Sequence, residues 1–135
     1  MFRYFCKSKI HRAAVTGANV EYMGSITVST DLLEAAGLYP YEKVQGVDID
    51  NGARLETYVI PAEGPTGEIC INGAAARLVN EGDKVIIISY CMLSEEEIAK
   101  FKPIVVFVDD NNKITQIEEK EPCFKTHLQL LAESR

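Results

Sequence analysis

The sequence predicts a mainly β fold, a small closed barrel with two or three short helices. The chain consists largely of short β-rich runs bounded by turn residues, and only two short segments carry helix-capping signals. The dipeptide Asn51-Gly52 between two β-rich segments is a strong hairpin signal. Many short strands with few helices are typical of a small barrel.

The length and charge agree with one domain of this kind. The 135 residues match the commonest domain size and can bury a core without disulfides or metals. The net charge of −6 argues against nucleic acid as a partner. The longest apolar runs, Val85–Ile88 and Ile104–Val108, are far shorter than the ~20 residues of a membrane helix, so we expect no membrane partner. We expect one domain over residues 1–117 and a tail over 118–135, helical or partly disordered.

The first predicted elements are strands separated by a turn. Tyr4–Val15 mixes apolar and basic residues and ends at a turn over Thr16–Asn19. A second strand over Val20–Met23 is interrupted at Gly24-Ser25 and resumes at Ile26–Ser29.

A short helix is predicted over Asp31–Ala36. Asp31 and Glu34 have the spacing of a capping box, and Gly37 stands where a C-cap glycine belongs.

The clearest local element is a hairpin of Lys43–Asp50 and Arg54–Ile60. Asn51-Gly52 joins these strands, and a two-residue turn of this type requires positive φ at both residues.

The second half of the chain repeats this alternation of strands, turns and one capped helix. Strands are predicted over Glu68–Ile71, Lys84–Leu93, Ile104–Val108 and Lys113–Ile117. Small residues over Asn72–Ala76 follow the first of these strands, a turn over Glu81–Asp83 precedes the second, and a turn at Asp110–Asn112 joins the last two. The helix begins at the capping box Ser94/Glu97 and ends before Pro103.

The four cysteines do not form a cluster. Cys6, Cys70, Cys91 and Cys123 contain no C-x-x-C pair, and neither histidine has a metal partner at ligand spacing, so we expect no metal site. Charges at the N terminus stand where a signal peptide would place its apolar region. A cytoplasmic protein with reduced thiols is the interpretation that fits.

The dipeptide Gly24-Ser25 is unusual inside a β-rich run. A glycine there permits a tight backbone and close approach to its carbonyl, although the dipeptide taken alone favours the more ordinary explanation, a β-bulge. The chain has no phosphate-binding glycine loop and no G-x-S-x-G motif.

Five short blocks together resemble one known family. The blocks are Lys9–Arg12, Tyr22–Ser25, Asn51–Tyr58, Ile71–Arg77 and Gly82–Ile87. Their order and spacing over residues 1–117 are similar to the aspartate 1-decarboxylase family of pyruvoyl enzymes.

The resemblance implies a double-psi β-barrel that assembles as a homotetramer with active sites between subunits. It also implies a covalent cofactor made from the chain. The Ser25 hydroxyl would attack the Gly24 carbonyl, and the resulting ester would eliminate and hydrolyse, leaving a pyruvoyl group at position 25. L-aspartate would form a Schiff base with that group and lose CO₂ to give β-alanine for pantothenate and coenzyme A biosynthesis.

The resemblance also assigns site residues. Tyr58 would donate a proton to the decarboxylated carbon, and Arg54 offers a planar fork for a carboxylate. Strand alternation places these two on one face and Thr57 on the other, although the family uses that threonine in its site. The remaining substrate-binding residues implied are Lys9, Asn72, Gly73, Ala74 and Ala75. His11 is interpreted as a structural hydrogen-bonding residue, and Tyr22 lines the pocket or simply packs.

Two other functions remain open at this point. One is a non-catalytic β-barrel for binding or assembly. The other is a pyruvoyl enzyme for a different acid, because Arg54 and Lys9 suit glutamate or cysteine sulfinate as well as aspartate.

Overall fold

The computed structural model describes residues 1–121, which form nine strands and three short helices. The mainly β prediction is therefore confirmed. In chain order the elements are β1 (Phe2–Ala14), β2 (Gly17–Asn19), β3 (Ser25–Val28), α1 (Thr30–Ala36), β4 (Lys43–Asp48), β5 (Arg54–Pro61), β6 (Ile69–Asn72), the 3₁₀ helix η1 (Gly73–Leu78), β7 (Lys84–Ser94), α2 (Glu95–Ile98), β8 (Ile104–Val108) and β9 (Ile114–Glu118). The expected tail lies almost entirely outside the described residues.

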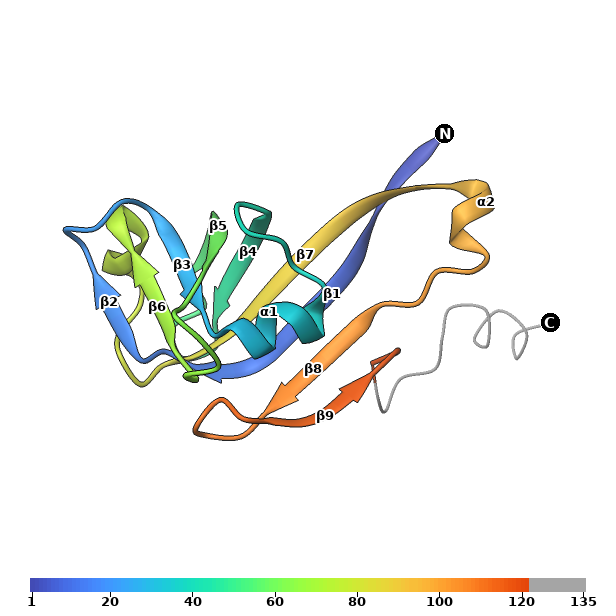
Figure 1. Ribbon diagram of the computed structural model, residues 1–135. Helices are drawn as coiled ribbons and strands as arrows, with labels where there is room; N and C mark the ends of the chain where they lie inside the picture. The colour runs from blue at the N-terminus through green and yellow to red at the C-terminus, as the bar shows by residue number, and fades with distance from the viewer. Residues whose placement is uncertain (122–135) are drawn as a thin grey trace.

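The strands form one mixed sheet that closes through a single chain segment. Their order is β2-β6-β3-β5-β4-β7-β1-β8-β9. Only Val15 and Thr16 separate β1 from β2, so this segment pairs with β7 at one end and with β6 at the other. A ring of strands results, from which the long β1–β7 pair extends toward the N terminus and α2 (Figure 1).

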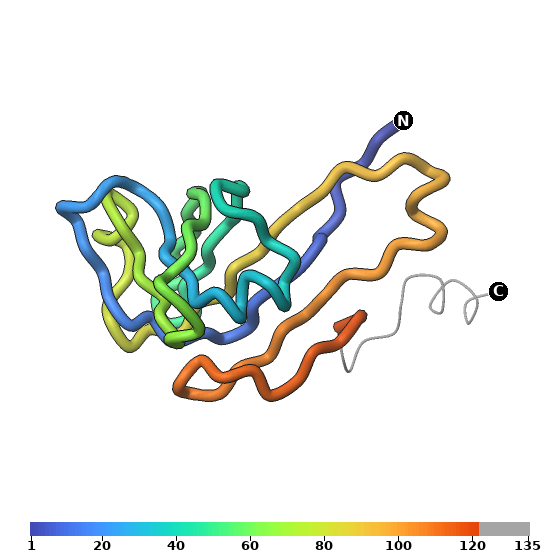
Figure 2. The backbone as a smooth tube through the Cα atoms, viewed as in Figure 1, coloured from blue at the N-terminus to red at the C-terminus, as the bar shows by residue number. Residues whose placement is uncertain are grey.

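Polar side chains secure the corner between β1 and β2. The Thr16 amide donates to the Ile69 carbonyl at 2.8 Å, and the Ile69 amide donates to Thr16 Oγ1 at 2.9 Å. Asn112, fully buried in the β8–β9 turn, donates to the carbonyls of Ala14 and Gly67. These bonds hold the β8–β9 hairpin against the ring of strands. In Figure 2 this hairpin lies below the ring.

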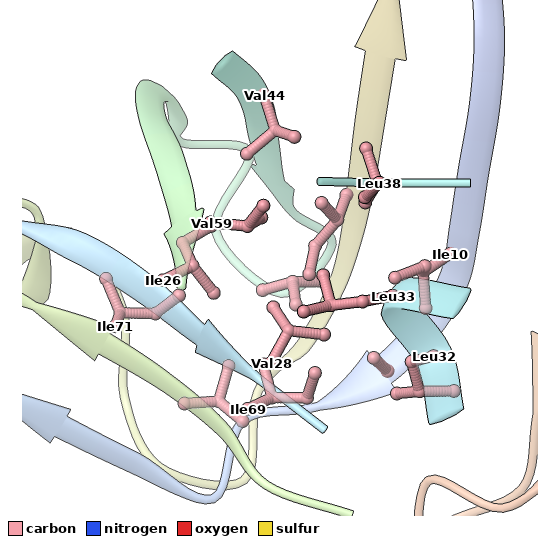
Figure 3. Close-up of a cluster of buried hydrophobic side chains, with 14 of the residues drawn as sticks. Ile10, Ile26, Val28, Leu32, Leu33, Leu38, Val44, Val59, Ile69 and Ile71 are labelled. Carbon is pink, nitrogen blue, oxygen red and sulfur yellow. The ribbon is translucent and has the colours of Figure 1, made fainter. Parts of the chain in front are cut away.

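The core is aliphatic and follows strand alternation. Ile26 and Val28 of β3 pair with Ile71 and Ile69 of β6, and all four are buried. Figure 3 shows these side chains with those of Val44, Val59 and the α1 leucines gathered inside the ring. The opposite face of β3 and β6 is therefore free for polar groups.

The prediction for residues 16–23 is wrong in its order of elements. Gly17–Asn19, expected as a turn, is strand β2, because it pairs in parallel with β6. Val20–Met23, expected as a strand, is a turn in which Asn19 Oδ1 accepts from the Glu21 amide at 3.1 Å. The side chain of Asn19 stabilises a turn over the residues that follow it, and the alternation of apolar and polar residues in the sequence did not predict this turn.

The start of α1 and the β4–β5 turn also differ from the sequence predictions. Helix α1 begins at Thr30, with Ser29 as N-cap, so the expected Asp31/Glu34 capping box is wrong. The Lys43–Asp50 and Arg54–Ile60 hairpin is confirmed, but its turn already begins at Ile49, and of Asn51 and Gly52 only Gly52 has positive φ.

Other local signals are confirmed. Gly37 ends α1 in the left-handed conformation, and Ser94 with Glu97 forms a complete capping box at α2. Within residues 1–121, no helix has the length and apolar character needed to span a membrane.

Replacing Leu32 by Ala tests the packing of α1 on the core. The Leu32 side chain is completely buried, so its truncation removes apolar contacts and leaves a cavity. We expect the free energy of unfolding to fall by about 2–5 kcal/mol in urea titrations followed by circular dichroism. Glu34→Ala, on the exposed side of the same helix, should change it little; equal losses in the two variants would contradict this packing.

Candidate functional site

Ser25 is the first residue of β3 and lies at a boundary between exposed and buried chain. Its side chain is 1% exposed, whereas Tyr22, Met23 and Gly24 before it are exposed. A Cβ placed on Gly24 would meet no atom within 4 Å. The peptide bond before Ser25 thus joins an exposed glycine, with open space where its side chain would be, to a residue with a buried hydroxyl.

Asn72 holds that hydroxyl in place. Register aligns Asn72 of β6 with Ser25, and Asn72 Nδ2 donates to Ser25 Oγ at 2.9 Å. The same Nδ2 donates to Thr27 Oγ1 at 2.9 Å, so one amide group binds both hydroxyls on this face of β3. Asn72 is itself 3% exposed, which keeps water from competing for these bonds.

Cys70 completes this network, and sequence reasoning missed it. Its Sγ donates to Asn72 Oδ1 at 3.3 Å, which orients the amide so that Nδ2 faces the two hydroxyls. Burial, and to a lesser extent Glu68 and Glu81, raise the pKa of Cys70, so the thiol keeps its proton at neutral pH. Counting two residues back from Asn72 and two forward from Ser25 would have found Cys70 and Thr27.

Gly73 brings the start of η1 against the Gly24 backbone. Its φ is +75°, and a Cβ there would lie 2.7 Å from Gly24 Cα and 2.8 Å from Gly24 N. Only glycine fits both the left-handed conformation and this close approach. Ala74 and Ala75 follow in the first turn of η1, which Figures 1 and 2 show beside the β2–β3 loop.

Strand β5 places Tyr58 level with Ser25. The parallel β3–β5 register aligns Ile26 with Val59, and one step back along both strands aligns Ser25 with Tyr58. Tyr58 is partly exposed, and its ring packs against Tyr41 with centroids 5.9 Å apart. Thr57 is half-buried on the other face of β5.

Arg54 lies at the far end of the same face of β5. Tyr58 is the fourth residue after Arg54, which corresponds to roughly 13 Å along a strand. Its Nη1 donates to Gln45 Oε1 at 3.4 Å, and Gln45 also accepts from Tyr90 Oη at 2.8 Å. Gln45 and Tyr90 line a hollow of about 460 Å³ with Tyr4, Lys43, Val44 and Glu56. This hollow adjoins Arg54 and does not include Ser25.

Lys9 and His11 are not brought to Ser25 within one chain. Lys9 lies on the stretch of β1 that pairs with β7 and β8, and His11 follows it there, whereas Ser25 lies on β3, which pairs with β5 and β6. Lys9 forms an ion pair with Glu121. His11 packs edge-on against Phe107, and burial, then Arg12 and Lys9, lower its pKa, so it is neutral near pH 7.

Comparison with known proteins identifies the same family by a family model and by individual relatives. A family model described as aspartate decarboxylase matches residues 1–115. An aspartate 1-decarboxylase of Caldicellulosiruptor bescii is 59% identical over 121 residues, which are 90% of this chain and 94% of the relative. Enzymes of that same name from Bacillus subtilis and Clostridium beijerinckii are 57% and 60% identical, over 91% and 85% of this chain and 97% and 93% of their own.

Replacing Gly73 by Ala tests its contact with Gly24. The added Cβ must displace the Gly24 backbone, so we expect any cleavage of the 24–25 bond to slow at least tenfold, measured by mass spectrometry of the ageing protein. Gly64→Ala is the matched control, because a Cβ there meets no atom within 4 Å. A Gly73→Ala chain that folds, by circular dichroism, and cleaves at the control rate would show that this contact does not matter.

Proposed function

The chain belongs to the aspartate decarboxylase family, and on this premise we propose that it cleaves itself between Gly24 and Ser25. It is a carboxy-lyase that converts L-aspartate to β-alanine with a serine-derived pyruvoyl group and serves pantothenate biosynthesis. The family fold is the double-psi β-barrel, which is the closed sheet described above. Family membership decides against a non-catalytic barrel and favours aspartate over other acids.

The cleavage proposal rests on the buried hydroxyl of Ser25, which Asn72 binds and which follows a residue without a side chain, Gly24. Asn72 fixes Oγ, while Gly24 offers no side chain to block its own carbonyl carbon. A nucleophile held beside its target needs little further ordering to react. The Gly73 contact supports the proposal, because it restricts the Gly24 backbone on the side facing η1.

The proposed cleavage proceeds in three balanced steps. Ser25 Oγ forms a bond to the Gly24 carbonyl carbon as the Gly24–Ser25 amide bond breaks, which gives an ester and a free amine. Loss of the Ser25 α-proton with breakage of the Cβ–Oγ bond then releases a Gly24 carboxylate and leaves dehydroalanine. Water hydrolyses this residue to a pyruvoyl group and ammonia.

We propose distinct roles for the residues around that group. Its ketone supplies the electron-accepting carbonyl for decarboxylation. Tyr58, level with position 25, donates the proton that replaces the lost carboxylate. Asn72 first holds Ser25 Oγ and afterwards orients the substrate, with Gly73, Ala74 and Ala75 shaping the pocket.

The residues that bind substrate carboxylates are proposed to come from more than one subunit. Arg54 is roughly 13 Å along β5 from Tyr58, and Lys9 lies on β1, which pairs with neither β3 nor β5. Thr57 lies on the other face of β5, as strand alternation requires. A homotetramer with sites between subunits would combine these side chains in one pocket.

The projecting β1–β7 pair supports an oligomer. It carries exposed apolar side chains that a monomer would leave in water, and soluble monomers rarely expose them in groups. These residues are Met1, Phe2, Tyr4, Tyr90 and Met92. We further propose a single domain over residues 1–117 and a cytoplasmic location, where the free thiols of Cys6, Cys70 and Cys91 would persist.

Denaturing mass spectrometry of the purified protein tests the cleavage. We expect a fragment of 24 residues ending at Gly24 and one of 111 residues that begins with the pyruvoyl group and lacks a free α-amine. Ser25→Ala removes the nucleophile and should leave only the 135-residue chain, while Ser94→Ala should process as wild type. A wild-type chain that remains intact after long warm incubation would contradict the proposal.

Replacing Tyr58 by Phe separates cleavage from turnover. The variant keeps the ring but loses the hydroxyl, so it should still cleave while CO₂ release from aspartate falls about 10²–10⁴-fold. Tyr41→Phe, in the ring that packs against Tyr58, is the control and should retain most of the activity. Normal turnover by cleaved Tyr58→Phe enzyme would exclude Tyr58 as the proton donor.

A further inference from the structure

The thiol of Cys70 lies beside the amide that binds Ser25. Cys70 and Asn72 both belong to β6 and stand two residues apart, so their side chains share one face of the strand. Cys70 Sγ donates to Asn72 Oδ1 at 3.3 Å, while Asn72 Nδ2 donates to Ser25 Oγ at 2.9 Å. We propose that Cys70 is a positioning residue for self-cleavage and for aspartate turnover, because it decides which end of the Asn72 amide faces residue 25. This inference rests on the proposed cleavage at Gly24.

The space around the Asn72 amide does not by itself select one of its two ends. The Oδ1 and Nδ2 ends are almost equal in size, so their hydrogen-bond partners decide the orientation. The hydroxyls of Ser25 and Thr27 can each donate or accept, and they would therefore satisfy either end. The contact on the other side of the amide, with Cys70, is the one that distinguishes the two orientations.

A protonated thiol favours Oδ1 on its own side of the amide. It can donate to a carbonyl oxygen, whereas sulfur is a weak acceptor and would leave a buried amide N–H poorly satisfied. Burial, then Glu68 and Glu81, raise the pKa of Cys70, so the thiol keeps the proton that it donates. Among residues 1–121, no second group donates to Asn72 Oδ1.

The orientation matters because negative charge develops on Ser25 Oγ during cleavage. As Oγ bonds to the Gly24 carbonyl carbon, it gives up its hydroxyl proton, which ends on the amine that the broken amide bond releases. An N–H donor at Oγ stabilises the charge that develops during this proton loss, whereas a carbonyl oxygen in its place would oppose it. After cleavage, the same Nδ2 would face the substrate bound at residue 25.

Gly17 of β2 leaves the space that the thiol occupies. The parallel β2–β6 register pairs Gly17 with Cys70, and a Cβ on Gly17 would lie 3.3 Å from Cys70 Sγ. The backbone of Gly17 is that of an ordinary strand, so alanine fits its conformation and would only push the thiol aside. The chain thus offers a second way to displace the thiol, without any change to Cys70 itself.

Substitutions at Cys70 separate a positioning role from simple packing. Cys70→Ser keeps a donor, so the bond after Gly24 should cleave within about threefold of the wild-type rate, followed by mass spectrometry of freshly expressed precursor. Cys70→Val keeps apolar bulk but has no donor, so cleavage should slow about 10–100-fold. A residue that only packs would give the reverse order, because valine suits a half-buried strand better than serine. Cys91→Ala, at a half-buried cysteine of β7, is the control and should cleave like wild type.

Turnover by the cleaved variants gives a second readout. With aspartate as substrate, cleaved Cys70→Val should lose about tenfold or more in kcat/KM, and Cys70→Ser should recover most of that loss. Gly17→Ala should slow cleavage about two- to fivefold, because Cys70 keeps its donor but is displaced from the amide.

Two results would overturn the proposal in different ways. Folded Cys70→Val that cleaves at the wild-type rate, or faster than Cys70→Ser, would show that the thiol only packs, and the proposed cleavage would stand without it. A wild-type chain that never cleaves would remove the proposed function and this role together. Should Cys70→Val fail to fold, Cys70→Ala also lacks the donor and provides the same comparison with Cys70→Ser.

Discussion

The position of β3 between β6 and β5 is the constraint on which the site depends. One register sets Ser25 opposite Asn72, and the other sets it level with Tyr58. A slip of one residue in either ladder would turn Ser25 into the core and an isoleucine out of it. The burial of Ile26, Val28, Ile69 and Ile71 resists such a slip, so the apolar face of the ladder fixes the chemistry on its polar face.

On the polar face of β3 and β6, the side-chain amide of Asn72 forms hydrogen bonds with three other side chains. Asn72 donates to two hydroxyls and accepts from one thiol, and all four side chains project from the same ladder. A buried network of this kind is favourable only when each member has its partner. Cys70 therefore has a positioning role that its residue type alone does not indicate.

Much of the fold could be predicted because its local signals are strong. Gly37, the Ser94/Glu97 capping box and the β4–β5 hairpin depend on neighbours in sequence. β2 could not be found in this way, because only its pairing with β6 makes Gly17–Asn19 a strand. The same limit applies to the site: the resemblance pointed to Ser25, Asn72 and Tyr58, whereas Cys70 and Thr27 join them only because β3 and β6 pair in this register.

Because only two residues separate β1 from β2, both strands precede Gly24 in the chain. With the proposed cleavage at Gly24, both strands would belong to a separate 24-residue peptide that closes the ring. Its cations Arg3, Lys7 and Lys9 pair with Glu95, Glu42 and Glu121 of the larger piece. Folding of the precursor is unimolecular in the chain, but reassembly of the mature form requires two molecules to meet. The mature enzyme would therefore regain its structure with a concentration dependence that its precursor lacks.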